Sequence, residues 1–279
     1  MHQLQMIIDS HQHFWKYRPE RDVWIDETMG VLKRDFLPKD LATVLEGQGI
    51  DGCVAVQADQ SEEETEFLLQ CAEEYTFIKG VVGWVDLCDI NLEERLSYFT
   101  KNPLLKGFRH IAQAEEDDYF LREEVQRGIA MLSKYQLTFD LLIYPQQLPS
   151  AIVLVKKFPK QKFVLDHIAK PAIRSEIPEF WRSHIQQLAK NKNVFCKLSG
   201  MVTEASKQGF KNEDFTPYME HVFHCFGPER ILFGSDWPVC LLASDYKKVF
   251  GLVQNFISSF DKRTQAGILG ENAVAFYNL

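Results

Sequence analysis

The sequence predicts a single (β/α)8 barrel, and two observations lead to this fold class. About eight short apolar segments alternate with longer amphipathic patterns along the 279 residues, and strands that are apolar throughout are typical of a parallel sheet covered on both faces. No Gly- or Ser-rich linker divides the chain. We therefore expect residues 1–279 to form one domain, as such barrels usually do.

The predicted strands are short and rich in Val, Ile, Leu and Phe, which are residues that favour strands or buried positions. A helical pattern or a run of turn residues separates each strand from the next. In chain order the eight strands are Met6–Asp9, Gly52–Gln57, Ile78–Val85, Leu104–Arg109, Leu137–Ile143, Phe163–His167, Val194–Ser199 and Arg230–Asp236.

Several of the intervening helices carry recognisable start and stop signals. Pro38 suits the first turn of a helix that should end at Gly47 or Gly49. Ser61 and Glu64 have the spacing of a capping box, in which each side chain bonds the other residue's backbone N–H. Apolar residues also recur at helical spacing in two later segments, at Val125, Ile129 and Leu132, and at Val249, Phe250, Val253 and Ile257.

Composition excludes several classes of partner. Asp and Glu outnumber Lys and Arg by 39 to 31, so the formal net charge is −8, which argues against nucleic acid or an anionic membrane surface. No apolar run approaches the ~18 residues of a membrane span. The six cysteines form no CxxC pair, and the N-terminus lacks a secretory pattern. We expect free thiols and a cytoplasmic protein, and the oligomeric state stays open.

Chemically reactive side chains end several of the predicted strands. His11 and His13 follow the first strand, and the alternation of a strand places them on the same side. Arg109 ends the fourth strand, His167 the sixth and Asp236 the eighth. Because the carboxyl ends of barrel strands meet at one face, we expect these residues to converge there.

Each of these residues also has a purely structural explanation. Asp236 could cap the following helix, His167 could be a core histidine, and Arg109 could pair with Asp140 on the next strand. One shared site accounts for all the strand ends together, whereas the structural explanations must be found separately for each residue. We therefore favour a functional site.

Eight sequence phrases strengthen this interpretation: IDSHQHFW, GVVGWVDL, KGFRH, DLLIYPQQLP, LDHIAKP, CKLSGM, FGSDWPV and ENAVAFY. Together with the His-x-His pair, the later histidine and the final aspartate, they resemble the lactonase branch of the amidohydrolase superfamily over residues 6–279. The resemblance implies a (β/α)8 barrel. It also implies an enzyme that opens a small sugar lactone, such as the deoxy-sugar lactone L-fuconolactone, to its hydroxy acid.

The resemblance also implies roles for individual residues. His11, His13, His167 and Asp236 would hold a single Zn2+ with an open position for water, although the family resemblance allows catalysis without metal. A binuclear site is not expected, because strand four ends in Arg109. Asp236 would act as the general base and His167 as a donor to the developing oxyanion. Arg109 would place a fixed positive charge beside the carbonyl or the forming carboxylate.

Candidate substrate-binding residues lie near the same strand ends. Aromatic side chains line many carbohydrate sites, and amide or ammonium groups can bond sugar hydroxyls. On this basis we expect contacts from Trp15, Gln57, Tyr144, Lys170 and Trp237. The acidic run at 115–118 should be solvated or form part of a lid, and the long segment 14–36 should form a lid or a subunit contact.

Two alternatives remain at this stage. A metal-dependent decarboxylase of a related amidohydrolase branch would share the histidines and the aspartate. A non-catalytic barrel that binds a sugar acid would keep only the fold. The phrases KGFRH, YPQQLP and KLSGM favour the lactonase branch over the decarboxylase. The intact set of three histidines and one aspartate argues against a barrel that has lost its catalysis.

Overall fold

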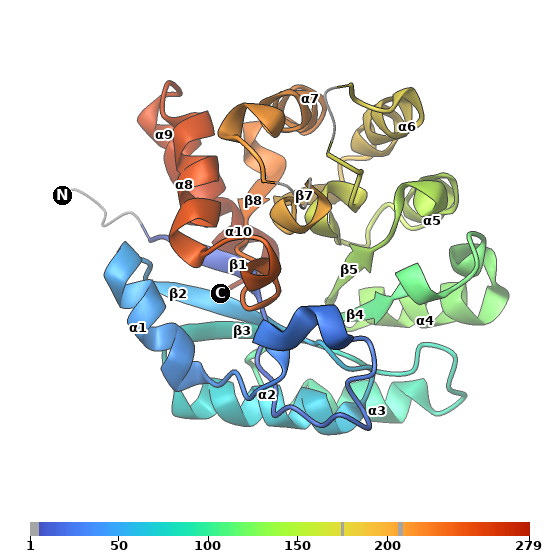
Figure 1. Cartoon of the computed structure of the whole chain (residues 1–279). Helices are drawn as coiled ribbons and strands as arrows, with labels where there is room; N and C mark the ends of the chain where they lie inside the picture. Colours follow the sequence, from blue (N-terminus) through green and yellow to red (C-terminus); the bar gives the residue numbers. More distant parts are fainter. Residues whose placement is uncertain (1–5, 174–175, 206–208) are drawn as a thin grey trace.

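The computed structural model describes residues 6–173, 176–205 and 209–279, and within them eight parallel strands lie in sequence order. Helices surround these strands in an outer ring (Figure 1). The chain is therefore the predicted (β/α)8 barrel. The strands are β1 (Ile8–Gln12), β2 (Gly52–Val56), β3 (Ile78–Gly83), β4 (Leu105–Ile111), β5 (Thr138–Leu142), β6 (Phe163–Leu165), β7 (Val194–Leu198) and β8 (Ile231–Phe233).

Backbone hydrogen bonds beyond the end of β8 join the last strand to the first. The N–H of Asp236 donates to the carbonyl of His11 (2.8 Å), and the N–H of His13 donates to the carbonyl of Trp237 (2.7 Å). The segment that follows β8 thus runs beside β1. This pairing brings the late aspartate against the early histidines, although more than 200 residues separate them in the sequence.

Ten α-helices are assigned in the described part of the chain. The first of them begins and ends as predicted. Pro38 occupies the first turn of α1, and Gly49 ends this helix with φ +67°, a left-handed conformation that glycine adopts without strain. The helices are α1 (Pro38–Gln48), α2 (Glu62–Glu74), α3 (Leu92–Phe99), α4 (Glu123–Lys134), α5 (Leu148–Lys157), α6 (Glu179–Ala189), α7 (Thr216–Phe226), α8 (Tyr246–Ile257), α9 (Lys262–Ala266) and α10 (Asn272–Tyr277).

Only half of the predicted capping box forms at the start of α2. The hydroxyl of Ser61 accepts the N–H of Glu64 (3.2 Å), as expected. The Glu64 carboxylate, however, turns away from the Ser61 N–H and accepts the N–H groups of Ala58 and Asp59 in the preceding loop. The Glu64 carboxylate therefore bonds the loop after β2 and not Ser61, because the loop offers two N–H donors instead of one.

Strand alternation divides the core into two layers. Val54 and Val56 of β2 point into the barrel, where they meet Val82, Val164 and other apolar side chains. The alternate residues of the strands point outward and pack against the surrounding helices. Phe276 and Tyr277 of α10 join the inner layer, so the C-terminal helix packs against the interior of the barrel.

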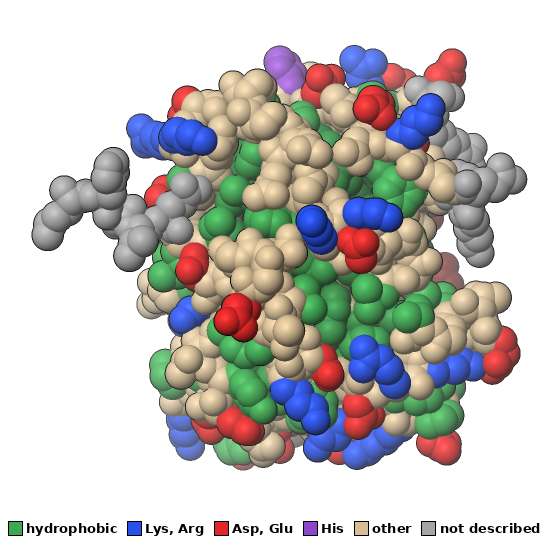
Figure 2. Space-filling model, turned by 60° about the vertical axis from the view of Figure 1, so that its left-hand side comes forward, with side chains coloured by type: hydrophobic (Ala, Val, Ile, Leu, Met, Phe, Trp, Pro, Cys, Tyr) green, Lys and Arg blue, Asp and Glu red, His purple; other side chains and the backbone are tan. Residues whose placement is uncertain are grey.

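The surface carries charges of both signs. On the face shown in Figure 2, Lys and Arg side chains are interspersed with Asp and Glu, and neither sign gathers into one large patch. Among the described residues, no helix combines the length and the hydropathy needed to cross a bilayer. All six cysteines are free, as expected.

Candidate active site

A bulge in β1 turns the first two histidines toward the barrel interior. Ile8 points inward, so strict alternation would direct Ser10 inward and His11 outward. The pairing of β1 with β2 shifts register between Asp9 and Gln12, and a shift of this kind re-aims the side chains that follow it. As a result, His11 and His13 lie with their Nε2 atoms 3.2 Å apart.

The ring of His13 is oriented by a backbone carbonyl. Its Nδ1 lies 2.8 Å from the carbonyl oxygen of Val56, which can only accept a hydrogen bond. The proton of the neutral ring therefore sits on Nδ1, and the lone pair of Nε2 faces Oδ1 of Asp236 at 3.3 Å. Two electron-rich atoms that face each other in a buried site call for a cation or a proton between them.

Asp236 lies beyond β8 in the left-handed region, with φ +57°. Its Oδ1 is 3.9 Å from Nε2 of His11 and 3.9 Å from Nε2 of His167. Burial alone would raise the pKa of this carboxyl, but the rings, led by His167, together hold its pKa well below the usual range. Asp236 is therefore ionised at neutral pH, although its side chain is almost completely buried.

His167 projects from a left-handed turn that directly follows β6. Four consecutive residues, from His167 to Lys170, have φ between +47° and +62°. Non-glycine residues seldom adopt this conformation, and such strain is concentrated at functional sites. The turn places Nδ1 of His167 2.8 Å from the hydroxyl of Ser199. Burial lowers the pKa of His167 to about 4, so the ring is neutral at pH 7.

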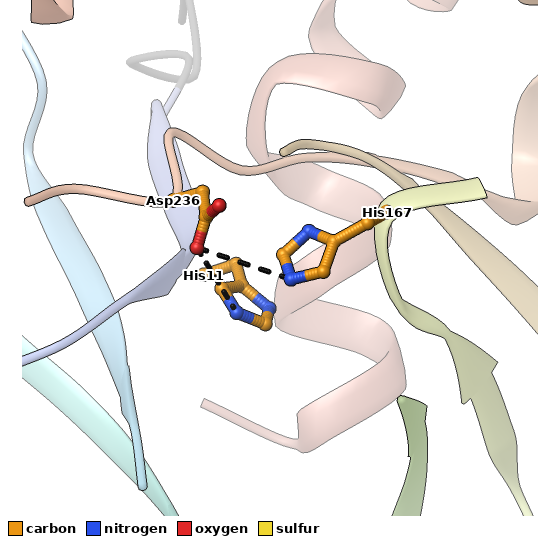
Figure 3. Close-up of side chains that lie close together, drawn as sticks. All are labelled: His11, His167 and Asp236. Carbon is orange, nitrogen blue, oxygen red and sulfur yellow. Dashed lines mark ion pairs between the residues drawn. The ribbon is translucent and has the colours of Figure 1, made fainter. Parts of the chain in front are cut away.

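Figure 3 shows His11, His167 and Asp236 pointing toward one another from three separate segments. Their nearest ligand-type atoms all lie within 4.8 Å of one another. Imidazole nitrogen and carboxylate oxygen are typical ligands of Zn2+, and the Nε2 lone pair of His13 also faces Asp236. The donor set therefore fits a single Zn2+.

A buried ionic network surrounds His11. Nζ of Lys197 lies 2.5 Å from Oδ2 of Asp140, 2.9 Å from Oδ1 of Asp166 and 3.1 Å from Nδ1 of His11. Burial raises the pKa of Asp166, but Lys197 and His11 outweigh it and hold that pKa well below its usual range. With Asp236, three carboxylates face the two cations Lys197 and Arg109, and the excess negative charge favours a divalent cation.

Arg109 belongs to this network, and its carboxylate partner is Asp166. Its Nη1 lies 3.2 Å from Oδ2 of Asp166 and 3.2 Å from Nε2 of His11. Its Nη2 donates to the carbonyl of Gln57. The pairing of Arg109 with Asp140 is wrong, because Asp140 is bound by Lys197 and by the Tyr277 hydroxyl at 2.8 Å.

The five residues expected to bind substrate separate into two groups. Tyr144 and Lys170 line a pocket of about 780 Å³ that is bordered by the loops after β4, β5, β6 and β7. Trp15, Trp237 and Gln57 are buried and do not line this pocket. The two tryptophans pack against Phe36 with centroids 5.2 Å apart. Within segment 14–36, Trp15 and Phe36 exchange two backbone hydrogen bonds of 2.9 Å.

Three charged residues of the network were not assigned a role from the sequence. Lys197, Asp140 and Asp166 are completely buried. Lys197 carries the clearest signal, since it lies in an apolar strand, between Cys196 and Leu198. A lysine at such a position needs buried counter-charges, but its partners, which lie on other strands, are not evident from the pattern.

Comparisons with known proteins agree with this arrangement. The amidohydrolase family matches residues 8–279, so the chain belongs to that family. It is 38% identical to an L-fucono-1,5-lactonase of Burkholderia multivorans, over 98% of this chain and 96% of the relative. It is 34% identical to an L-fucono-1,5-lactonase of Burkholderia ambifaria, over 98% of this chain and 95% of the relative.

A solved structure shares the fold closely. The crystal structure of an amidohydrolase from Burkholderia multivorans with bound Zn superposes with a TM-score of 0.94 and 37% sequence identity. The match covers 98% of this chain and 99% of that one. The metal in that protein is consistent with the fit of the donor set found here.

Proposed function

We propose that this protein is a lactonase that hydrolyses a sugar lactone, with L-fucono-1,5-lactone as the first candidate substrate. One observation carries the proposal: an ionised, buried carboxylate, Asp236, lies among the rings of His11, His13 and His167. The two Burkholderia relatives named L-fucono-1,5-lactonase support the choice of substrate. The decarboxylase and the non-catalytic barrel are less well supported, because neither accounts for these relatives.

Asp236 is the proposed general base and acid. Its low pKa keeps it ionised but makes it a weak base. It therefore takes the proton of the attacking water late, when the new bond to the carbonyl carbon has made that proton acidic. Protonated Asp236 then returns the proton to the ring oxygen as the C–O bond breaks, so one carboxylate serves both halves of the reaction.

The surrounding residues stabilise the negative charge that develops on the carbonyl oxygen. Without metal, the Nε2–H of the neutral His167 ring can donate a hydrogen bond to this oxygen, whereas with Zn2+ bound the same nitrogen would be a metal ligand. Arg109 places a fixed positive charge 3.2 Å from the ring of His11. A Zn2+ held by His11, His13, His167 and Asp236 would supply Lewis-acid polarisation of the carbonyl.

Tyr144 and Lys170 are the proposed substrate contacts, because both line the pocket between the loops. The buried positions of Trp15, Gln57 and Trp237 favour a role in supporting the walls of the site. We also propose that residues 1–279 act as one domain. A cytoplasmic location is proposed as well, since free thiols are typical of a reducing compartment.

The experiment is a pH-indicator assay of acid release over a panel of aldonolactones and unsubstituted lactones, with and without a chelator. We expect acid release on L-fucono-1,5-lactone above the spontaneous rate. Loss of activity in the chelator arm, restored by added Zn2+, would assign the metal to catalysis. Acid release no faster than in buffer on every lactone would refute the proposed function.

A further inference from the structure

The loop pocket begins at the same turn that carries His167. Lys170 is the last residue of the left-handed turn, and its N–H donates to the carbonyl of His167 (2.7 Å). Lys170 is also one of the residues that line the pocket. The His167 ring and the edge of the pocket are therefore carried by the same short turn.

The pocket wall contains many groups that bind hydroxyls. Among its described lining residues are three carboxylates, three glutamine amides, a phenol and the apolar faces of Phe180 and Trp181. Carboxylates accept hydrogen bonds from hydroxyl groups, and aromatic rings cover the C–H faces of sugars. The carboxylates are Glu115, Asp117 and Glu204.

Two of the carboxylates are held in place before any ligand arrives. Oε1 of Glu204 lies 2.7 Å from Nζ of Lys170 and accepts a hydrogen bond from the Thr203 hydroxyl at 3.1 Å. Oε1 of Glu115 lies 3.1 Å from Nε2 of His110, whose ring stacks on Tyr119 with centroids 4.6 Å apart. Glu115 is thus a fixed part of the wall and not a freely solvated member of the acidic run.

Gln113 adds an amide to the wall, and its N–H groups have no partner among the described residues. Its Nε2 is buried and has no hydrogen-bond partner among the described residues, and the residue lines the pocket. A buried amide donor without an acceptor is costly. A half-turn of the terminal amide exchanges Nε2 with Oε1, and it would present these N–H groups to a hydroxyl oxygen of a ligand in the pocket.

We propose that this pocket binds the hydroxyl-bearing part of the lactone, and that Glu204 and Gln113 determine specificity by bonding its hydroxyl groups. This inference rests on the proposed lactonase function. The Lys170–Glu204 ion pair links recognition to the reacting centre, since Lys170 belongs to the turn that carries His167. The preferred substrate class is therefore a polyhydroxylated lactone, and an unsubstituted ring should be a poor substrate.

The test compares two lactones on the same enzyme. For L-fucono-1,5-lactone and unsubstituted δ-valerolactone, kcat/KM is measured with the wild type, with Glu204→Gln and with Gln113→Met, which removes the amide at nearly constant length. Each variant should lose about ten- to a hundredfold in the ratio of the two kcat/KM values, because a site built to bond hydroxyls discriminates through those bonds. Glu220→Gln, at an exposed carboxylate on α7 that does not line the pocket, makes the same charge change and should leave the ratio unchanged.

The outcomes separate this inference from the proposed function. If the wild type opens both lactones but neither variant changes the ratio by more than threefold, the specificity assignment is overturned while the lactonase proposal stands. If the wild type opens neither lactone, both are overturned. If one variant does not fold, as judged by its thermal transition, the ratio for the other decides.

Discussion

Gly200 lies against the ring of His167, so closely that a Cβ on Gly200 would be 2.6 Å from Cγ of His167 and 3.1 Å from Oδ2 of Asp236. Gly200 follows β7 and has φ +58°. Both the space and the backbone conformation therefore require glycine at this position. The backbone of the loop after β7 forms a wall that fixes where the His167 ring can stand.

Gly200→Ala should displace this ring and reduce activity. Because a shift of about 1 Å can cost ~100-fold in rate, we expect kcat/KM on the preferred lactone to fall by about tenfold to a hundredfold. Gly49→Ala is the matched control, since Gly49 has φ +67° but no atom within 4 Å of the added Cβ. It should impose similar backbone strain without displacing a side chain of the site, and therefore without loss of activity. Equal activities of the two variants would show that Gly200 does not position His167.

Glu64 should make the stability of the protein depend on pH. Burial, ahead of every other cause, raises the pKa of this carboxyl to about 7 in the folded state. Since the folded state then binds more protons than the unfolded state between about pH 4.5 and 7, stability falls as pH rises through this window. Over this whole window the free energy of unfolding should fall by about 3 kcal/mol, since each unit of pKa difference contributes about 1.36 kcal/mol.

Glu64→Gln removes this titration but keeps an oxygen that can accept the N–H groups of Ala58 and Asp59. Urea unfolding of both proteins at several pH values gives the difference in the free energy of unfolding. The free energy of unfolding of the variant should increase relative to that of the wild type as pH rises from 4.5 to 7. A constant difference over that range would mean that the Glu64 carboxyl has an ordinary pKa in the folded state.

Lys197→Met should be strongly destabilising. The substitution leaves Asp140 and Asp166 buried without the ammonium that lies 2.5 and 2.9 Å from them. Removing one partner of a buried ion pair costs about 3–5 kcal/mol. Lys134→Met breaks an exposed pair with Glu93 and should leave the denaturant midpoint nearly unchanged. Similar midpoints for the two variants would contradict the structural role of the network.

Zn2+ binding should depend on the converging histidines and Asp236. Calorimetric titration of metal-free protein is expected to give one Zn2+ per chain, and His11→Ala should weaken the affinity by at least about tenfold, since even second-shell changes cost 10- to 100-fold. His224→Ala changes an exposed histidine on α7 and should bind Zn2+ normally. Unaltered binding to the His11 variant would place the metal elsewhere.

The sequence predicted the barrel because apolar strands and amphipathic helices each leave a periodic pattern. It also predicted that His11, His13, His167 and Asp236 would converge, since all of them follow or end strands. The bulge that aims His11 inward left no pattern of its own. The left-handed backbone conformation at His167 and Asp236 could not be predicted either, because residues other than glycine adopt it only when tertiary contacts impose it.

Charged pairs were harder to predict than single residues. Arg109 and Asp140 are register neighbours on β4 and β5, yet the cation that binds Asp140 is Lys197, from β7. Charged side chains inside a barrel can pair with residues on strands across its interior. Adjacency of two strands therefore does not determine which residues pair. For the same reason, half of the capping box at Ser61 was lost to loop donors that no sequence spacing indicates.

The most direct test of the account is the turnover of Asp236→Asn on a lactone that the wild type opens. Asparagine keeps the size of the side chain but can neither take nor return a proton. We expect kcat to fall by about 10²–10⁴, with the thermal transition still present to show that the variant folds. Turnover within a few-fold of the wild type would contradict the account, because the hydrolysis would then proceed without the carboxylate that it places at the centre of the site.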